Sequence, residues 1–84
     1  MNSKKYVDPT KYTLTELVKD GQKAKFSYYR DSEFWYEHDL GFLFPIPLKD
    51  VNGPASRAML LAEEKAIYLM RWIRKYIESL KEIS

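Results

Sequence analysis

The sequence contains no cysteine, and its three glycines stand far apart. Without thiols the chain can form no disulfide, no cysteine-based zinc site and no thiolate nucleophile. Gly21, Gly41 and Gly53 cannot together build the glycine-rich loop that cradles phosphates in nucleotide-binding motifs. No apolar run approaches the roughly 20 residues that a membrane helix needs. We therefore expect a soluble, cytoplasmic protein that has no membrane partner.

Residues for acid-base or metal chemistry are also scarce, because His38 is the only histidine. Glu37 and Asp39 flank it, but neighbours on a strand point to opposite faces, so the three side chains cannot converge on one metal ion. We expect His38 to stack on an aromatic neighbour. No serine has a histidine at a spacing that would activate it. The sequence thus predicts a non-enzymatic protein with no catalytic residue, cofactor or metal.

Charge is present in nearly equal amounts of each sign, and the formal net charge is +2. Lys and Arg are in excess over residues 1–30, whereas Asp and Glu are in excess over residues 31–50. A dedicated nucleic-acid binder usually shows one continuous basic surface, and the acidic middle of this chain would repel a phosphate backbone. The pattern is more typical of a mixed, solvated surface.

A length of 84 residues leaves room for one small domain. Residues 1–12 have no hydrophobic period and predict a flexible N-terminal arm, so the domain is expected to span residues 13–84. At its start, Thr13 and Glu16 have the spacing of a capping box, and Gly21 can end a helix in the left-handed conformation. A short helix is expected between them.

Eight of the 13 aromatic residues fall between Phe26 and Phe44, in segments that alternate as strands do. We expect strands over residues 23–30, 33–38 and 42–48, joined by short turns into an antiparallel meander. In the first strand, strict alternation puts Ala24, Phe26 and Tyr28 on one face. Pro45 and Pro47 lack the amide hydrogen that a central strand must donate, so the third strand is expected at an edge of the sheet.

Apolar residues recur at three- and four-residue steps after residue 57 and predict one long amphipathic helix over residues 57–82. The fold class is therefore α+β: a short N-terminal helix, a three-stranded antiparallel meander and a long C-terminal helix packed on one sheet face, in the order α-β-β-β-α. Four apolar residues exceed what one sheet face can cover and indicate a partner surface. They are Met59, Leu60, Ile67 and Met70.

Two groups of side chains are candidates for binding. Adjacent aromatic residues in the hairpin must face both ways, so one set joins the core and the other, with Tyr29 and Trp35, is available for a contact. Arg71, Arg74 and Lys75 form a basic patch on the last helix. Packing of the sheet, stacking of single-stranded nucleic acid and contact with a protein all remain open for the aromatic residues.

Two resemblances follow from these features. The order of elements is similar to that of double-stranded RNA-binding domains, but acidic residues Glu63 and Glu64 stand where those domains carry a lysine cluster, so no RNA-binding residue is implied. Residues 26–31, 35–37, 41–47, 61–66 and 70–75 resemble small uncharacterised proteins of bacteriophage and prophage genomes. This resemblance covers about residues 24–80. It implies a phage-associated accessory protein and carries over no functional residue.

The function expected from the sequence is stoichiometric binding to a host or phage protein, or to a second copy of the chain. The predicted contact residues are Tyr29, Trp35, Arg71, Arg74 and Lys75. The alternative is nucleic-acid binding through the basic face of the last helix together with the N-terminal lysines, Lys4 and Lys5.

Overall fold

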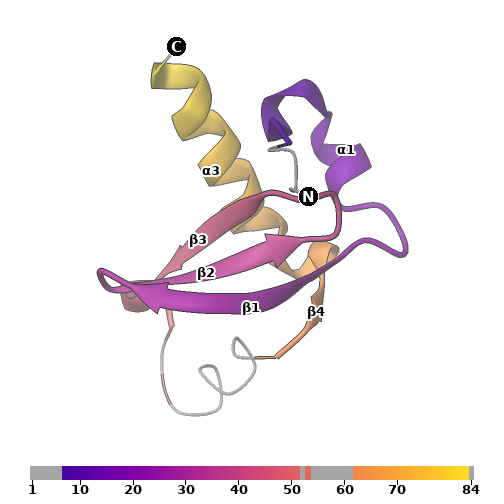
Figure 1. Ribbon diagram of the computed structural model, residues 1–84. Coiled ribbons are helices and arrows are strands. Elements are labelled where there is room, and N and C mark those ends of the chain that lie inside the picture. The colour runs from indigo at the N-terminus through magenta and orange to yellow at the C-terminus, as the bar shows by residue number, and fades with distance from the viewer. Residues whose placement is uncertain (1–6, 52, 54–61, 84) are drawn as a thin grey trace, which may run out of the picture.

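The aromatic segment folds into the three antiparallel strands that its alternation predicts (Figure 1). These are β1 (Lys23–Arg30), β2 (Glu33–His38) and β3 (Leu43–Pro47). A computed structural model describes residues 7–51, 53 and 62–83. Strand β3 lies at one edge of the sheet, as Pro45 and Pro47 predict, because an edge strand leaves one side of its backbone without ladder hydrogen bonds.

The sheet has four strands instead of the expected three, in the order β3-β2-β1-β4. Strand β4 (Glu64–Lys65) pairs with Lys23 and Ala24 of β1. Directly after it, the Ala66 amide donates a hydrogen bond of 2.8 Å to the Gln22 carbonyl. These backbone bonds between distant parts of the chain override the helical pattern of residues 62–69.

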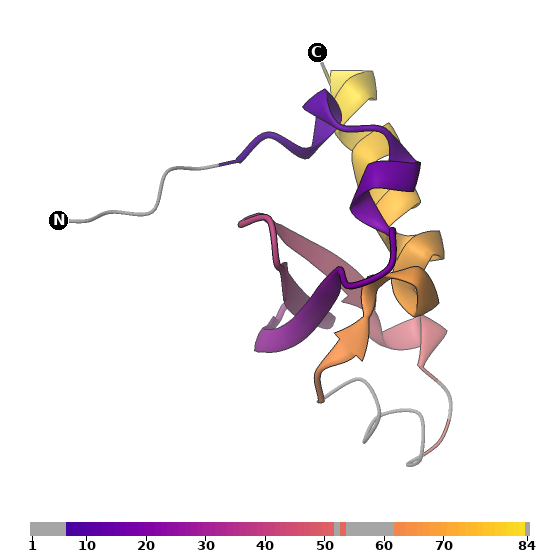
Figure 2. The same ribbon diagram turned by 90° about the vertical axis from the view of Figure 1, so that its right-hand side faces the viewer.

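The C-terminal helix is correspondingly shorter than predicted. A 3-10 helix, η3 (Ala66–Leu69), leads from β4 into α3 (Met70–Ile83), so the prediction of a continuous helix is wrong over residues 62–69. Residues 57–61 of that prediction lie outside the described residues. Helix α3 packs mainly against the edge strand β3 instead of lying across the whole sheet. Figure 2 shows α1 (Leu14–Leu17) and α3 close together on one side of the sheet.

The prediction of strict alternation in β1 is also wrong, because the register of β1 with β2 shifts between Phe26 and Tyr28. Phe26 is opposite Tyr36 and Tyr28 is opposite Trp35, so Ser27 is the extra residue of a β-bulge. Since Tyr36 and Trp35 are neighbours on a regular strand, they point to opposite faces. The bulge therefore turns Tyr28 to the face opposite Phe26.

The N-terminal elements are held by side-chain caps. The Thr13 hydroxyl accepts a hydrogen bond of 3.1 Å from the Glu16 amide, and the Thr13 amide donates one of 2.8 Å to the Glu16 carboxylate, which confirms the capping box. Helix α1 ends at Leu17, and Gly21 has a φ of +94° in the turn that follows. Before it, η1 (Pro9–Lys11) buries Pro9 and contacts α3. Residues 1–6 of the predicted arm lie outside the described residues.

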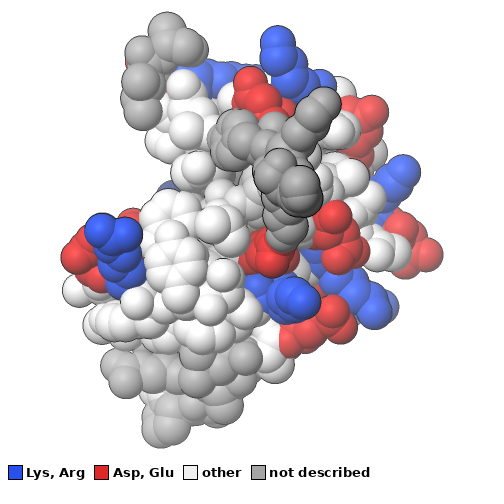
Figure 3. Space-filling model, in the orientation of Figure 1, with Lys and Arg blue, Asp and Glu red and all other residues white. Residues whose placement is uncertain are grey.

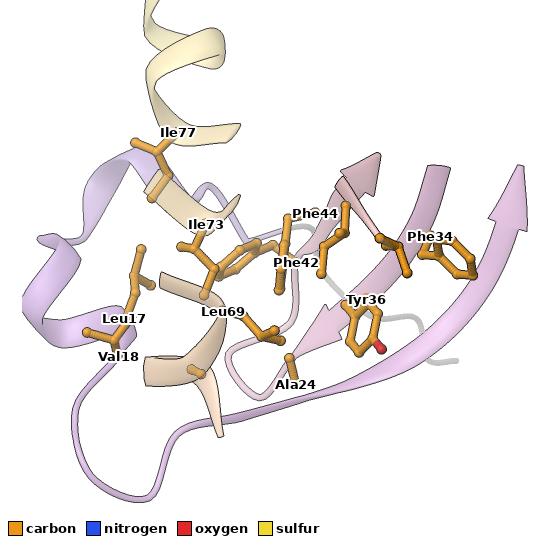
Figure 4. Packing of buried hydrophobic residues seen from close by; sticks show 13 residues of the cluster. Leu17, Val18, Ala24, Phe34, Tyr36, Phe42, Phe44, Leu69, Ile73 and Ile77 are labelled. Atoms are coloured by element: carbon orange, nitrogen blue, oxygen red, sulfur yellow. The ribbon is translucent and has the colours of Figure 1, made fainter. Parts of the chain in front are cut away.

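One hydrophobic core joins α1, the sheet, η3 and α3 (Figure 4). Its largest members come from the strands and from the turn between β2 and β3, and each is almost fully buried: Tyr36, Phe42, Phe44 and Ile46. Leu17 from α1 and Ile73 from α3 close the core from the other side. The Tyr36 hydroxyl has no hydrogen-bond partner among the described residues, and burial raises the pKa of this phenol. The sheet side of the core is thus largely aromatic. The 3-10 helix η2 (Leu48–Asp50) directly follows β3.

Candidate functional site

Two aromatic rings stack across β1 and β2 on the face that does not carry the core tyrosine. Tyr28 and Trp35 are directly opposite in the register, their ring centroids are 6.0 Å apart and their planes differ by 9°. Tyr28 is 38% exposed, and Trp35 is half-buried. The bulge at Ser27 makes this pair, because strict alternation would have turned Tyr28 to the other face.

Helix α3 extends the same cluster with two more rings. Trp72 and Tyr76 are four residues apart and therefore lie on one side of the helix. The Tyr76 ring meets Trp35 edge-on, with centroids 6.2 Å apart and planes at 87°. The indole Nε1 of Trp72 donates a hydrogen bond of 3.1 Å to Asp50 Oδ2 of η2. That bond fixes the orientation of the Trp72 ring and ties η2, which follows β3, to α3.

A shallow groove of about 140 Å³ lies between these rings and the edge strand. We name it the aromatic groove; its lining is Pro45, Pro47, Trp72, Lys75, Tyr76 and Ser79, and the Tyr28–Trp35 pair continues it along the sheet. The left outline of Figure 3 is hollowed between α3 and the hairpin end of the sheet. Since small-molecule sites usually measure 300–1,000 Å³, this groove suits one or two side chains of a partner better than a whole ligand.

The charges beside the aromatic groove have mixed signs. Lys75 contributes to its lining, and the Arg71 guanidinium lies 5.6 Å from the centroid of the Trp72 ring, within the range of a cation-π contact. On the strand side, Glu33 is paired with Pro47. The groove therefore presents an apolar surface between opposite charges, which favours apolar contact over long-range attraction to a single sign of charge.

The five residues predicted from the sequence fall into three places. Trp35 and Lys75 come together at the aromatic groove, and Arg71 lies beside it against Trp72. Arg74 lines a different groove, next to η1. Tyr29 is 49% exposed but packs edge-on against Phe34, with ring centroids 4.9 Å apart, on the face opposite Trp35. The structure thus divides what the sequence groups together.

Several groove residues have other roles in the sequence pattern. Trp72 and Tyr76 belong to the apolar period of residues 57–82, which predicts a core face, although both are only half-buried. Pro45 and Pro47 predict only an edge strand. The spacing of two indicates that Pro45 and Pro47 lie on one face of their strand, and the spacing of four indicates that Trp72 and Tyr76 lie on one face of their helix. Nothing in either segment alone shows that the strand face and the helix face meet.

A second exposed apolar cluster lies where η3 passes into α3. Ile67, Tyr68 and Met70 are 44%, 66% and 37% exposed. For Ile67 and Met70 this confirms the prediction of apolar surface left over at the flank of the helix. Met59 and Leu60, predicted with them, lie outside the described residues.

The only histidine is a structural residue of the core. His38 is 1% exposed and stacks on Phe42, with ring centroids 4.7 Å apart, as the sequence predicts. Its Nδ1 accepts a hydrogen bond of 3.1 Å from the Leu40 amide, so Nε2 carries the proton and donates to the Leu17 carbonyl at 2.7 Å. Both ring nitrogens are therefore occupied by the backbone, in the neutral tautomer.

The stability of the fold should depend on pH through His38. Burial lowers the pKa of its imidazole below the usual 6.5, although the Leu17 carbonyl opposes this shift. The unfolded chain therefore takes up a proton near pH 6.5 while the folded chain stays neutral, so the free energy of unfolding should fall as the pH drops below about 6.5 towards the folded pKa. Denaturant unfolding at pH 8 and pH 5 measures this loss.

His38→Gln is the matched control for that dependence, because its amide can donate to the Leu17 carbonyl but does not titrate. We expect this variant to lose less stability than the wild type between pH 8 and pH 5. Equal losses in the two proteins would show that other groups cause the pH dependence.

Within the described residues, no three or more His, Cys, Asp or Glu side chains are grouped so that they could hold a metal ion. In the same part of the chain, no helix is long and apolar enough to span a membrane. No family model, curated protein or solved structure matches this chain.

Proposed function

We propose that this chain is a small, non-enzymatic protein-binding module, and that the aromatic groove receives an extended apolar segment of a partner protein. One observation carries the proposal: the sheet and α3 gather two stacked rings, two further rings and two prolines around one groove at the surface. A core would bury these side chains fully, yet Tyr28, Trp35 and Tyr76 all keep exposed area.

The composition of the groove favours a protein partner. Tyrosine and tryptophan are enriched at protein interfaces, because a rigid ring gives a large contact area at a small cost in side-chain entropy. Grooves lined by aromatic rings bind extended proline-containing segments, which have little conformational entropy to lose. The aromatic groove has this lining, so we expect its partner segment to carry proline or other apolar residues.

We further propose that the partner is a host or phage protein met in the cytoplasm. The support for this origin is the resemblance to phage and prophage proteins that the sequence of residues 24–80 suggests. Self-association is the other protein contact that the exposed rings allow. Sedimentation velocity distinguishes the two, since only self-association raises the sedimentation coefficient of the purified chain with its concentration.

Nucleic-acid binding remains the alternative function. It would use Arg71, Arg74 and Lys75, which are all exposed, together with the N-terminal lysines. Phosphate contacts make affinity fall steeply with salt, whereas apolar contacts at a groove of mixed charge do not. A complex whose dissociation constant changes little between 50 and 200 mM salt therefore favours the protein partner.

A displayed peptide library tests the proposal directly. Selection on the purified protein should enrich proline-containing apolar peptides, and their binding should change the fluorescence of Trp35 and Trp72, the two tryptophans of the chain. Tyr28→Ala should weaken such a peptide by about tenfold, since an aromatic anchor contributes on the order of 1–2 kcal/mol. Tyr29→Ala is the matched control, because this neighbouring tyrosine is at least as exposed but faces the other way.

The proposal fails if no peptide is enriched, or if Tyr29→Ala weakens the selected peptides as much as Tyr28→Ala does. Circular dichroism of both variants shows whether each is folded before the comparison is made.

A further inference from the structure

A second, larger groove lies on the other flank of α3. It has a volume of about 460 Å³ and runs between η1, the start of α1 and the outer turns of α3. Its lining is Thr10, Lys11, Tyr12, Thr13, Leu14, Arg74, Ile77, Glu78 and Lys81. We name it the cationic groove. Its volume lies within the usual range of small-molecule sites.

The charges of the cationic groove are mainly positive. Lys11 comes from η1, while Arg74 and Lys81 come from α3, and Glu78 is the one carboxylate among the lining residues. Lys11 lies more than 60 positions before Arg74 and Lys81 in the sequence. The packing of η1 against α3 brings Lys11 to the same groove as the two cations of the helix. The lining residues alone sum to a formal charge of +2. Asp8 and Glu16, which accept hydrogen bonds from Thr10 and Thr13, remain charged beside the groove and reduce this excess.

The floor of the groove is apolar. Ile77 is 7% exposed, and Tyr12 and Leu14 are half-buried against the same core. The hydroxyls of Thr10 and Thr13 are already bonded to Asp8 and Glu16. A ligand would therefore be held by apolar contact below and by cations at the rim, with little help from neutral hydrogen-bonding groups.

We propose that the cationic groove binds a phosphate monoester whose phosphate is attached to an apolar group. A phosphate monoester carries about −1.5 to −2 charges at pH 7, and Lys11, Arg74 and Lys81 are the cations of the lining that would face it. Arg74 offers the planar pair of donors that suits phosphate oxygens, and Lys11 and Lys81 supply further charge. The apolar group then covers Tyr12, Leu14 and Ile77. This site is separate from the aromatic groove, so the two proposals stand or fall independently.

Phenyl phosphate is the probe for this site. Titrated into the full-length ¹⁵N-labelled chain, it should shift the backbone amides of Lys11, Tyr12 and Arg74 and saturate with a dissociation constant at or below about 1 mM. Benzamidine has the same ring with the opposite charge and should leave these amides unmoved. Inorganic phosphate lacks the apolar group and should bind at least about tenfold more weakly.

Two neighbouring variants sharpen the test. Arg74→Gln should raise the dissociation constant of phenyl phosphate about tenfold, because it removes a charge-assisted contact. Lys75→Gln removes the same charge one residue later, from the aromatic groove, and should leave binding unchanged. The proposal is overturned if phenyl phosphate moves no amide of the groove, if benzamidine moves the same amides, or if the two variants weaken binding equally.

Discussion

Replacing Ile73 by alanine should reduce the free energy of unfolding by about 2–5 kcal/mol. Ile73 is fully buried and carries α3 into the core against the sheet. Its truncation loses apolar contact and leaves a cavity that the close-packed aromatic neighbours cannot fill. A chain of 84 residues has only several kcal/mol of net stability, so the variant should be largely unfolded at 37 °C. Urea unfolding followed by circular dichroism measures the change.

Lys75→Ala is the control for this prediction, since it lies on the same helix and its side chain is exposed. It should change the free energy of unfolding by less than about 0.5 kcal/mol. If Ile73→Ala is no less stable than Lys75→Ala, then α3 does not pack into the core as described.

A methyl group added at Gly41 should cost about 2–3 kcal/mol of stability, for two reasons. Gly41 has a φ of +104°, which is unfavourable for any residue with a side chain. A Cβ atom there would also lie 3.3 Å from Val7 Cγ2. Val7 precedes η1, and its side chain would have to move by a few tenths of an ångström to accept this contact. Thermal or urea unfolding of Gly41→Ala gives the total cost.

Gly21→Ala separates the two reasons. Gly21 has a similar φ of +94°, but a Cβ atom there has nothing within 4 Å. Its substitution should therefore carry the backbone strain alone, about 1–2 kcal/mol, and less than Gly41→Ala. Equal effects at the two glycines would mean that Val7 does not rest on this turn, and would support a flexible arm that includes residue 7.

Much of the sheet could be predicted from local sequence. Asp31 and Ser32 take positive φ values of 52° and 65° in the hairpin turn, where short polar residues are favoured. Thr13 and Glu16 form their capping box because both partners lie within one helical turn. Pro45 marks the edge strand because proline lacks an amide hydrogen. In each case the physical cause lies within a few residues of its effect.

The elements that the sequence missed depend on distant parts of the chain. Strand β4 consists of only two residues and exists because Glu64 and Lys65 meet β1. The helical period of the surrounding residues gives no sign of this pairing. The bulge at Ser27 is equally hidden, since an alternating run of Lys, Ser and Tyr fits a regular strand as well as a bulged one. The face of Tyr28 was therefore predicted wrongly.

The candidate site shows the same division. Trp35 and Lys75 could be named from residue type, because exposed tryptophan and lysine are chemically suited to contacts. That they share a groove depends on how α3 crosses β3, which neither segment encodes alone. Arg74 and Lys75 are adjacent in sequence, yet they line different grooves, because successive residues of a helix point in different directions around its axis.

The aromatic groove depends on the contact between the rings of α3 and Trp35 of the sheet. A two-dimensional nuclear Overhauser spectrum of the purified chain tests this contact directly. The structure predicts cross-peaks between the ring protons of Trp35 and Tyr76, because their ring centroids are 6.2 Å apart in an edge-on contact. If the protein is folded and both rings are assigned, but no cross-peak connects them, the aromatic groove does not exist in solution.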